Sequence, residues 1–207
     1  EGDTLLIKSV YPEITDEPSL SIVKEGQPKQ LNENLGYLLG FIMAEGWVEK
    51  DSRMGRYGNR IGMCSSEKSI ITNTSNIIHT EFRYQPTIEI KNYDYETSQG
   101  LLLQKQMFSI RINRKEINQF FVENFGFTDM LCAENKFVPQ KIFESSKSVA
   151  HAFLSGYIDG DGSVHKNRNV IHLGSVSKKL IEGLALLLQQ LGHIPKYLMQ
   201  KRDPTAK

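Results

Sequence analysis

Two acidic residues stand in nearly the same short context. Glu45 is the next-to-last residue of the stretch LLGFIMAEG (38–46), and Asp161 is the next-to-last residue of LSGYIDGDG (154–162). A glycine follows each acid. The spacing of small and apolar residues predicts two helices, each with its acid in the last turn. If the helices pack in parallel, the two carboxylates end side by side and face the negative ends of both helix dipoles. Carboxylate and carbonyl oxygens in this arrangement favour a divalent cation such as Mg²⁺.

The two predicted helices also share a strip of small side chains. Small residues recur at every fourth position: Gly36, Gly40 and Ala44 in the first helix, and Ala152, Gly156 and Gly160 in the second. Residues four apart lie on one helix face, so the two strips can meet backbone to backbone. Glycine within a helix costs about 1 kcal/mol relative to alanine, and close packing would compensate for it. We expect Gly46 and Gly162 to end the helices in the left-handed conformation.

The order of elements repeats after each acid. Residues 47–64 predict two strands around a glycine-rich turn, and residues 163–176 predict a shorter hairpin. A helix follows in each copy, with Ser66 and Ser177 as the expected N-caps. The first copy continues with two strands (87–95 and 104–112) and a helix (115–126), whereas the second contains only one more extended segment before residue 207. We therefore expect a lead-in arm or linker (1–30), a first αββαββα unit (31–144) and a second, truncated unit (145–207).

Composition excludes several classes of protein. The longest apolar run covers residues 35–44 and is too short to span a bilayer. Cys64 and Cys132 cannot form a disulfide framework or a cysteine-rich metal site, and we expect them to be small buried residues of a protein in a reducing compartment. The cytoplasm is therefore the expected location, or the nucleus in a eukaryote. The net charge of +1 does not by itself indicate a nucleic-acid partner.

Basic and polar residues nevertheless gather in the predicted hairpins. A two-stranded ribbon fits the major groove of DNA, where Arg, Lys, Asn and Gln read base edges, and further basic residues would bind phosphates. Taken one at a time, each of these side chains could equally be a solvated strand residue. The candidate DNA-binding residues are Lys50, Arg53, Arg56 and Arg60 after the first acid, Lys91, Lys105 and Arg111 in the later strands, and His165, Lys166, Arg168 and His172 after the second acid.

These motifs resemble those of the LAGLIDADG homing endonucleases, specifically the two-motif kind encoded within inteins. The resemblance covers about residues 31–207. It includes NKFVPQKIF (135–143), similar to a lysine-and-proline block of that family. In addition, the opening EGDTLLI (1–7) is similar to the segment that leads from an intein's splicing domain into its endonuclease. It implies an α+β fold, in which a monomer with pseudo-twofold symmetry packs its motif helices centrally and straddles double-stranded DNA with two curved sheets.

The resemblance also implies the chemistry. The family cuts both strands of a long DNA site with Mg²⁺, which would here be held by Glu45 and Asp161, and its basic catalytic residue maps onto Lys136. Glu45 departs from the commoner aspartate, and the truncated second unit offers no partner for Lys136, so a second polypeptide could complete that unit.

Other interpretations stay open at this stage. Lys136 could be a solvated surface lysine. The chain could also be a non-cleaving nucleic-acid binder of the same fold (a DNA-binding regulator, an RNA maturase or a decayed endonuclease) or a structural interaction domain. The filled acidic positions favour an endonuclease.

Overall fold

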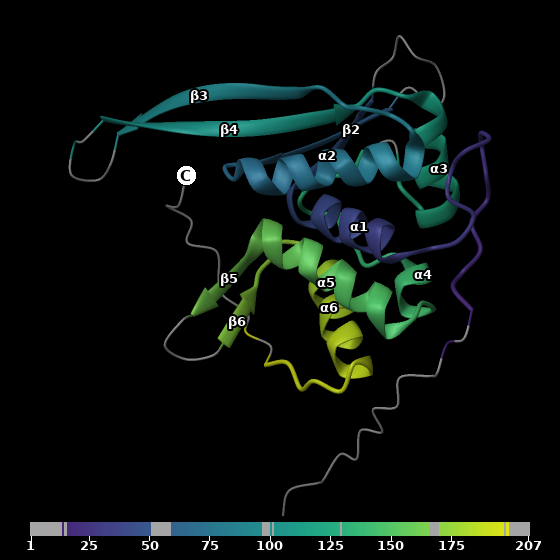
Figure 1. Cartoon of the computed structure of the whole chain (residues 1–207). Helices are drawn as coiled ribbons and strands as arrows, with labels where there is room; N and C mark the ends of the chain where they lie inside the picture. The colour runs from purple at the N-terminus through teal and green to yellow at the C-terminus, as the bar shows by residue number, and fades with distance from the viewer. Residues whose placement is uncertain are drawn as a thin grey trace, which may run out of the picture.

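The computed structural model describes residues 14, 16–50, 59–96, 100, 102–128, 130–165, 170–196 and 198. The fold is α+β (Figure 1). The first helix–strand–strand–helix–strand–strand–helix series is confirmed. Its elements are α1 (Glu33–Glu45), β1 (Gly46–Lys50), β2 (Asn59–Ser65), α2 (Lys68–Phe82), β3 (Ile88–Glu96), β4 (Leu102–Ile112) and α3 (Lys115–Phe125). The chain continues with α4 (Gln140–Phe143), α5 (Lys147–Asp161), β5 (Gly162–His165), β6 (Val170–Leu173) and α6 (Lys178–Gln190).

Helices α1 and α5 pack against each other along their glycine strips, as the sequence predicts. A Cβ atom added at Gly40 would lie 1.9 Å from the carbonyl oxygen of Phe153, and one added at Gly156 would lie 2.0 Å from that of Tyr37. Further along the pair, a Cβ at Gly160 would meet Ala44 at 2.4 Å. Because the contact positions advance in the same direction along both helices, the pair is parallel, and the two acids lie at the same end.

The first four strands form one antiparallel sheet in the order β1-β2-β4-β3. Val48 pairs with Ile61, and Ile61 pairs with Ile112. All three side chains are buried with the aromatic residues of α3, so one face of the sheet is the core face. The hairpin of β3 and β4 is long, and α2 runs beneath it in Figure 1. The second sheet contains only β5 and β6 among the described residues.

The glycines after the motif helices do not adopt the left-handed conformation that the sequence predicts. Gly46 has φ −87° and ψ 161°, and Gly162 has φ −82° and ψ 148°, so both are extended and begin strands. These two positions require glycine for a different reason, which is a close contact with the preceding helix. A Cβ at Gly46 would lie 2.5 Å from the carbonyl oxygen of Ile42, and one at Gly162 would lie 2.6 Å from that of Ile158. The chain therefore turns directly from helix to strand, and this sharp exit leaves no room for a side chain.

Side-chain caps begin three of the helices. Asn32 accepts a hydrogen bond from the Leu35 amide at the start of α1, Ser146 caps α5, and Ser177 caps α6 as expected. The expectation for Ser66 is wrong. Helix α2 begins one residue later, after Glu67, which makes no side-chain cap.

Residues 16–31, most of which we expected to form a lead-in arm, pack onto the rest of the chain. Asn124 of α3 accepts from the Ser21 amide at 2.8 Å and donates to the Ser21 carbonyl at 3.0 Å. Lys141 of α4 donates to the Ser19 carbonyl, and Glu17 accepts from the Ser146 amide at the start of α5. This segment thus connects α3 with the α4–α5 region. In the described part of the chain, no helix is long and apolar enough to cross a membrane.

Candidate active site

The α1–α5 pair places Glu45 and Asp161 together because both acids occupy the last position of their helices. A Cβ at Gly160 would lie 3.1 Å from Cγ of Glu45, so the Glu45 side chain runs against the last turn of α5. Glu45 is partly buried, whereas Asp161 lies at the surface. The juxtaposition of the two carboxylates, expected from the sequence, is therefore present.

Lys136 is brought to the same place by the segment between α3 and α4. It is only 7% exposed, and its Nζ donates a hydrogen bond to the Ala44 carbonyl in the last turn of α1. The hydroxyl of Ser177 donates to the Lys136 carbonyl at 2.7 Å while it accepts from the Leu180 amide at 3.2 Å. One serine thus caps α6 and holds the backbone of Lys136. The alternative that Lys136 is a solvated surface lysine is wrong.

The two acids are held in an environment that disfavours their charge. Partial loss of hydration raises the pKa of Glu45 above its ordinary value, and the negative charge of Asp161 raises it further. The positive charges of Lys136 and Lys105 oppose this effect. The pKa of Asp161 is also raised by loss of hydration and lowered in part by Lys136. A bound cation would relieve both, because it favours the ionised carboxylates.

Burial lowers the pKa of Lys136, and the charges of Asp161 and Glu45 partly restore it. Negative charge on Cys64 or Cys132 would also raise the pKa of Lys136. Cys64 and Cys132 are free and only partly buried. Burial, and then the charge of Glu45, raise the pKa of the Cys64 thiol. The expectation of two buried small residues therefore misses their position at the edge of the charged cluster.

The donor set of the site fits a hard divalent cation with a largely aqueous shell. Glu45 and Asp161 supply carboxylate oxygens, and Mg²⁺ commonly binds through one or two carboxylates and retains several waters. Within the described ranges, no group of three or more His, Cys, Asp and Glu side chains is placed to enclose a metal. The two carboxylates thus fit a divalent cation that keeps several of its waters.

Strand register assigns the candidate basic residues to faces of the first sheet. Gly62 pairs with Arg111, and its neighbours Ile61 and Met63 belong to the core face. Because side chains alternate along a strand, Arg111 points to the opposite face. We call this the open face. The same register gives it the candidate residues Arg60, Lys91, Lys105 and Arg111.

Lys50 differs from these residues. It follows Val48 by two residues, so its side chain lies on the same side of β1 as the core face, although it is exposed at the end of the strand. On the second sheet, His165 and His172 lie on one face with their ring centroids 4.9 Å apart. Arg53, Arg56, Lys166 and Arg168 lie outside the described residues.

Comparison with known proteins identifies the family. Residues 148–204 match the family model described as a LAGLIDADG-like domain. The chain thus contains a LAGLIDADG-like domain. It is 31% identical over 170 residues to the uncharacterized protein MJ1054 of Methanocaldococcus jannaschii, a match that covers 79% of this chain and 17% of the relative. It is also 28% identical over 160 residues to the DNA-directed RNA polymerase subunit Rpo1C of the same organism, covering 77% of this chain and 16% of the relative.

A shorter and stronger similarity links this chain to the DNA polymerase of Thermococcus hydrothermalis. The two are 52% identical over 60 residues, which cover 29% of this chain and 4% of the polymerase. The chain thus spans less than a fifth of each of these relatives. Among solved structures, the homing endonuclease I-WcaI bound to its DNA recognition sequence matches with a TM-score of 0.49 and 14% identity, over 76% of this chain and 67% of that chain.

The tertiary structure adds residues that the sequence did not single out. Tyr37 of α1 donates to Asp159 of α5 at 2.7 Å, which connects the two motif helices through side chains. Tyr157 is buried beside Asp161 and donates to the Gly174 carbonyl at 2.7 Å. Burial and the charge of Asp161 both raise the pKa of Tyr157, so its hydroxyl remains protonated. The aromatic residues in the motif helices were the available signal, but the sequence alone did not give their partners.

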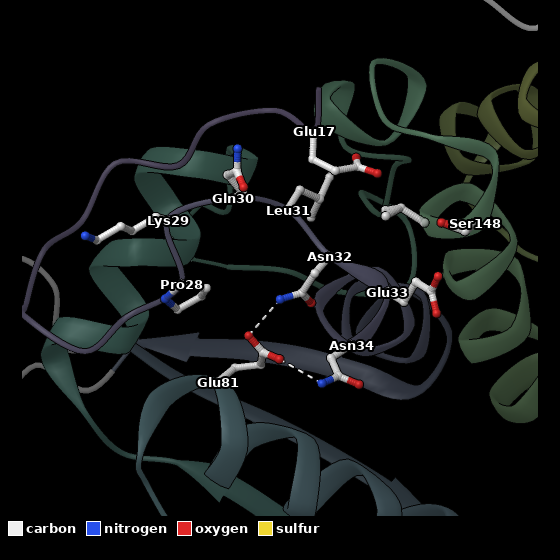
Figure 2. Close-up of a pocket in the computed structure, with 11 residues that line it drawn as sticks. Glu17, Pro28, Lys29, Gln30, Leu31, Asn32, Glu33, Asn34, Glu81 and Ser148 are labelled. Atoms are coloured by element: carbon white, nitrogen blue, oxygen red, sulfur yellow. Dashed lines mark hydrogen bonds between the residues drawn. The ribbon is translucent and has the colours of Figure 1, made fainter. Parts of the chain in front are cut away.

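A separate pocket of about 740 Å³ lies at the other end of α1 and α5 (Figure 2). Its lining includes the first residues of both helices, whereas the two acids lie at their last residues. Glu81 accepts from the side-chain amides of Asn32 and Asn34 there. These bonds join α2 to the start of α1, and we assign the pocket a structural role.

Proposed function

We propose that this chain is a site-specific DNA endonuclease that makes double-strand cuts in a long recognition site by metal-dependent phosphodiester hydrolysis. The observation that carries the proposal is the convergence of Glu45, Asp161 and the buried Lys136 at one end of the α1–α5 pair. Such a cluster beside an open face with basic residues suits a polyanionic substrate.

In this proposal, Glu45 and Asp161 hold Mg²⁺ at the site. When bound, the cation would polarise a phosphoryl oxygen and activate water for attack on the phosphodiester. The chain's own groups do the rest. The last turns of α1 and α5 fix the separation of the carboxylates, and the close glycine contacts leave the helices little freedom to slide.

Lys136 is the proposed basic catalytic residue. Its burial and the influence of both carboxylates on its pKa fit a group that stabilises negative charge on the reacting phosphate or orients the attacking water. Its hydrogen bond to the Ala44 carbonyl would hold the ammonium group in position before substrate binds.

The open face is the proposed DNA-binding surface of the first unit. Arg60, Lys91, Lys105 and Arg111 would contact phosphates and base edges, and His165 and His172 would do so from the second sheet. Arg60 and Arg111 already lie beside acidic neighbours, Glu49 at 4.0 Å and Glu89, respectively. DNA binding would exchange these surface ion pairs for phosphate contacts at little cost, because exposed pairs contribute roughly 0–1 kcal/mol.

The proposal includes an intein origin and an intracellular location. It is supported by the resemblance of the opening segment and by matches that span under a fifth of a DNA polymerase and an RNA polymerase subunit. Two free cysteines in the described chain suit a reducing compartment. We further propose a monomer with internal pseudo-twofold symmetry.

The decisive experiment is incubation of the protein with Mg²⁺ and the host gene from which the intein sequence has been removed, followed by mapping of the cut ends. Glu45→Gln and Asp161→Asn should abolish double-strand cleavage while DNA binding persists. Undiminished cutting by both variants would contradict the mechanism. Binding in EDTA without cleavage of any duplex by the unaltered protein would instead favour a non-cleaving binder of the same fold.

A further inference from the structure

The only tryptophan of the chain lies two residues beyond Glu45. Trp47 pairs in register with Gly62 of β2, and the two residues share the open face because their neighbours Val48 and Ile61 point into the core. The indole lies directly over the glycine. A Cβ added at Gly62 would lie 2.3 Å from Cζ2 and 2.4 Å from Cε2 of the ring. Because Gly62 has no side chain, it leaves space for the indole on the surface of β2, and we call this space at Gly62 the seat.

The position of this seat suggests its use. Trp47 is only partly buried, so part of the ring is accessible beside the end of α1. Gly62 also pairs with Arg111 on its other side, so the ring lies over the strand that neighbours this basic residue of the open face. A large apolar ring held on this surface would lie next to the phosphate that Glu45 serves.

The corresponding pair in the second sheet has different chemistry. There Ser163 pairs with His172, and Gly162 begins β5 as Gly46 begins β1. The ring of His172 contacts His165 at a centroid distance of 4.9 Å. One side of the carboxylate pair thus presents an indole over a glycine, and the other presents a hydroxyl and imidazoles. The two sides cannot make the same contacts with DNA.

We propose that Trp47 is a specificity-determining residue whose indole makes an apolar contact with the nucleotide adjacent to the cut, on the side of the first unit. This inference rests on the proposed DNA endonuclease function. Aromatic rings contribute through contact with the flat or methylated parts of bases. The seat over Gly62 fixes the ring before DNA binds, so little side-chain freedom would be lost on binding.

Tryptophan fluorescence provides the first test, because Trp47 is the sole reporter. The probe is a pool of randomised linear duplexes carrying fluorescein at one end, titrated in EDTA so that no strand is cut. Fluorescein anisotropy reports binding independently of the tryptophan. The proposal expects the emission of Trp47 to change in parallel with the anisotropy. Binding with unchanged tryptophan emission would overturn the proposal and leave the proposed function intact, whereas absence of binding would overturn both.

Selection of bound duplexes provides the second test. The wild-type protein should enrich a base preference at a position flanking the cut. Trp47→Ala should weaken that preference about tenfold, within the range expected for loss of an aromatic contact to a base, and Trp47→Phe should retain most of it. Gly62→Ala should reproduce the effect of Trp47→Ala although the tryptophan remains, because the added methyl group occupies the seat.

Gly174→Ala is the matched control, since a Cβ at Gly174 meets nothing within 4 Å. It should bind and select as the wild type does. Thermal unfolding of each variant separates loss of the contact from loss of the fold. If folded Trp47→Ala and Gly62→Ala proteins select the same bases as the wild type, Trp47 has no role in specificity.

Discussion

Replacement of Gly40 by alanine tests the close approach of the two motif helices on which the site depends. The added methyl group would lie 1.9 Å from the Phe153 carbonyl oxygen, 2.8 Å from its carbonyl carbon and 2.9 Å from the Tyr157 amide nitrogen. These are backbone atoms of α5, which cannot move aside as a flexible side chain can. The helices would have to separate by roughly 1 Å or more at this point to restore van der Waals distances.

Two opposing terms set the expected magnitude. Alanine in place of glycine favours a helix by about 1 kcal/mol. Overpacking a tight interior contact typically costs about 1–3 kcal/mol, and here the cost lies at the upper end because both partners are backbone. We therefore expect Gly40→Ala to lower the free energy of unfolding by about 1–2 kcal/mol. It should also reduce cleavage by the fully folded variant, because separation of α1 and α5 moves Glu45 away from Asp161.

Urea unfolding followed by circular dichroism measures the first quantity, and cleavage under conditions where the variant is fully folded measures the second. Gly183→Ala on α6 is the matched control, because its added methyl would meet only the Val138 side chain, at 2.9 Å, before any backbone. It should lower the free energy of unfolding less than Gly40→Ala does, because one side chain rather than a facing helix backbone has to shift, and it should leave cleavage unchanged. A Gly40→Ala protein as stable and active as the wild type would refute the backbone-to-backbone packing of the motif helices.

Three further predictions concern the charged cluster. Glu45→Gln should raise the free energy of unfolding at neutral pH in EDTA by about 0.5–1 kcal/mol. The reason is that the pKa of Glu45 is raised in the folded state, so its charge destabilises the fold at pH values above that pKa. The gain, measured by thermal unfolding, should therefore disappear as the pH falls through the folded-state pKa of Glu45. Lys136→Met should move the acidic limb of the cleavage pH profile to higher pH, because Lys136 lowers the pKa of both Glu45 and Asp161; an unmoved limb would separate Lys136 from the carboxylates. Ser177→Ala removes a buried cap and the donor to the Lys136 carbonyl, so it should lower the free energy of unfolding by about 1–2 kcal/mol in urea titrations. A neutral Ser177→Ala would show that neither hydrogen bond contributes to stability.

The charge balance of the cluster explains why its members should be tested singly. Lys136 is buried, and a buried ammonium group is costly unless nearby charges compensate it. Glu45 and Asp161 supply that compensation and in turn repel each other. Removing both acids would leave the lysine charge uncompensated, so the stability gain expected from Glu45→Gln should not extend to a double variant.

The sequence by itself determined the local elements and the helix faces that meet. Small residues at every fourth position define one face of each motif helix, and contact along that face was predicted from Gly40 and Gly156. Each acid ends its helix, so the juxtaposition of Glu45 and Asp161 required only that the helices pack in parallel, a direction that the tertiary structure decided. The alternation of the first four strands was equally local, because strand side chains alternate with a period of two.

Only the tertiary structure decided what surrounds the acids. Lys136 lies far from both in sequence, and its burial depends on how the segment after α3 crosses the end of α1. The strand register places Arg60 on the open face and Lys50 on the other side of the sheet, because an offset of one residue sends a strand side chain to the opposite face. The extended conformation of Gly46 was also not predicted from the sequence. A glycine after a helix commonly adopts the left-handed conformation. Here the chain enters β1 directly and passes close to the Ile42 carbonyl, and these contacts set the conformation of Gly46.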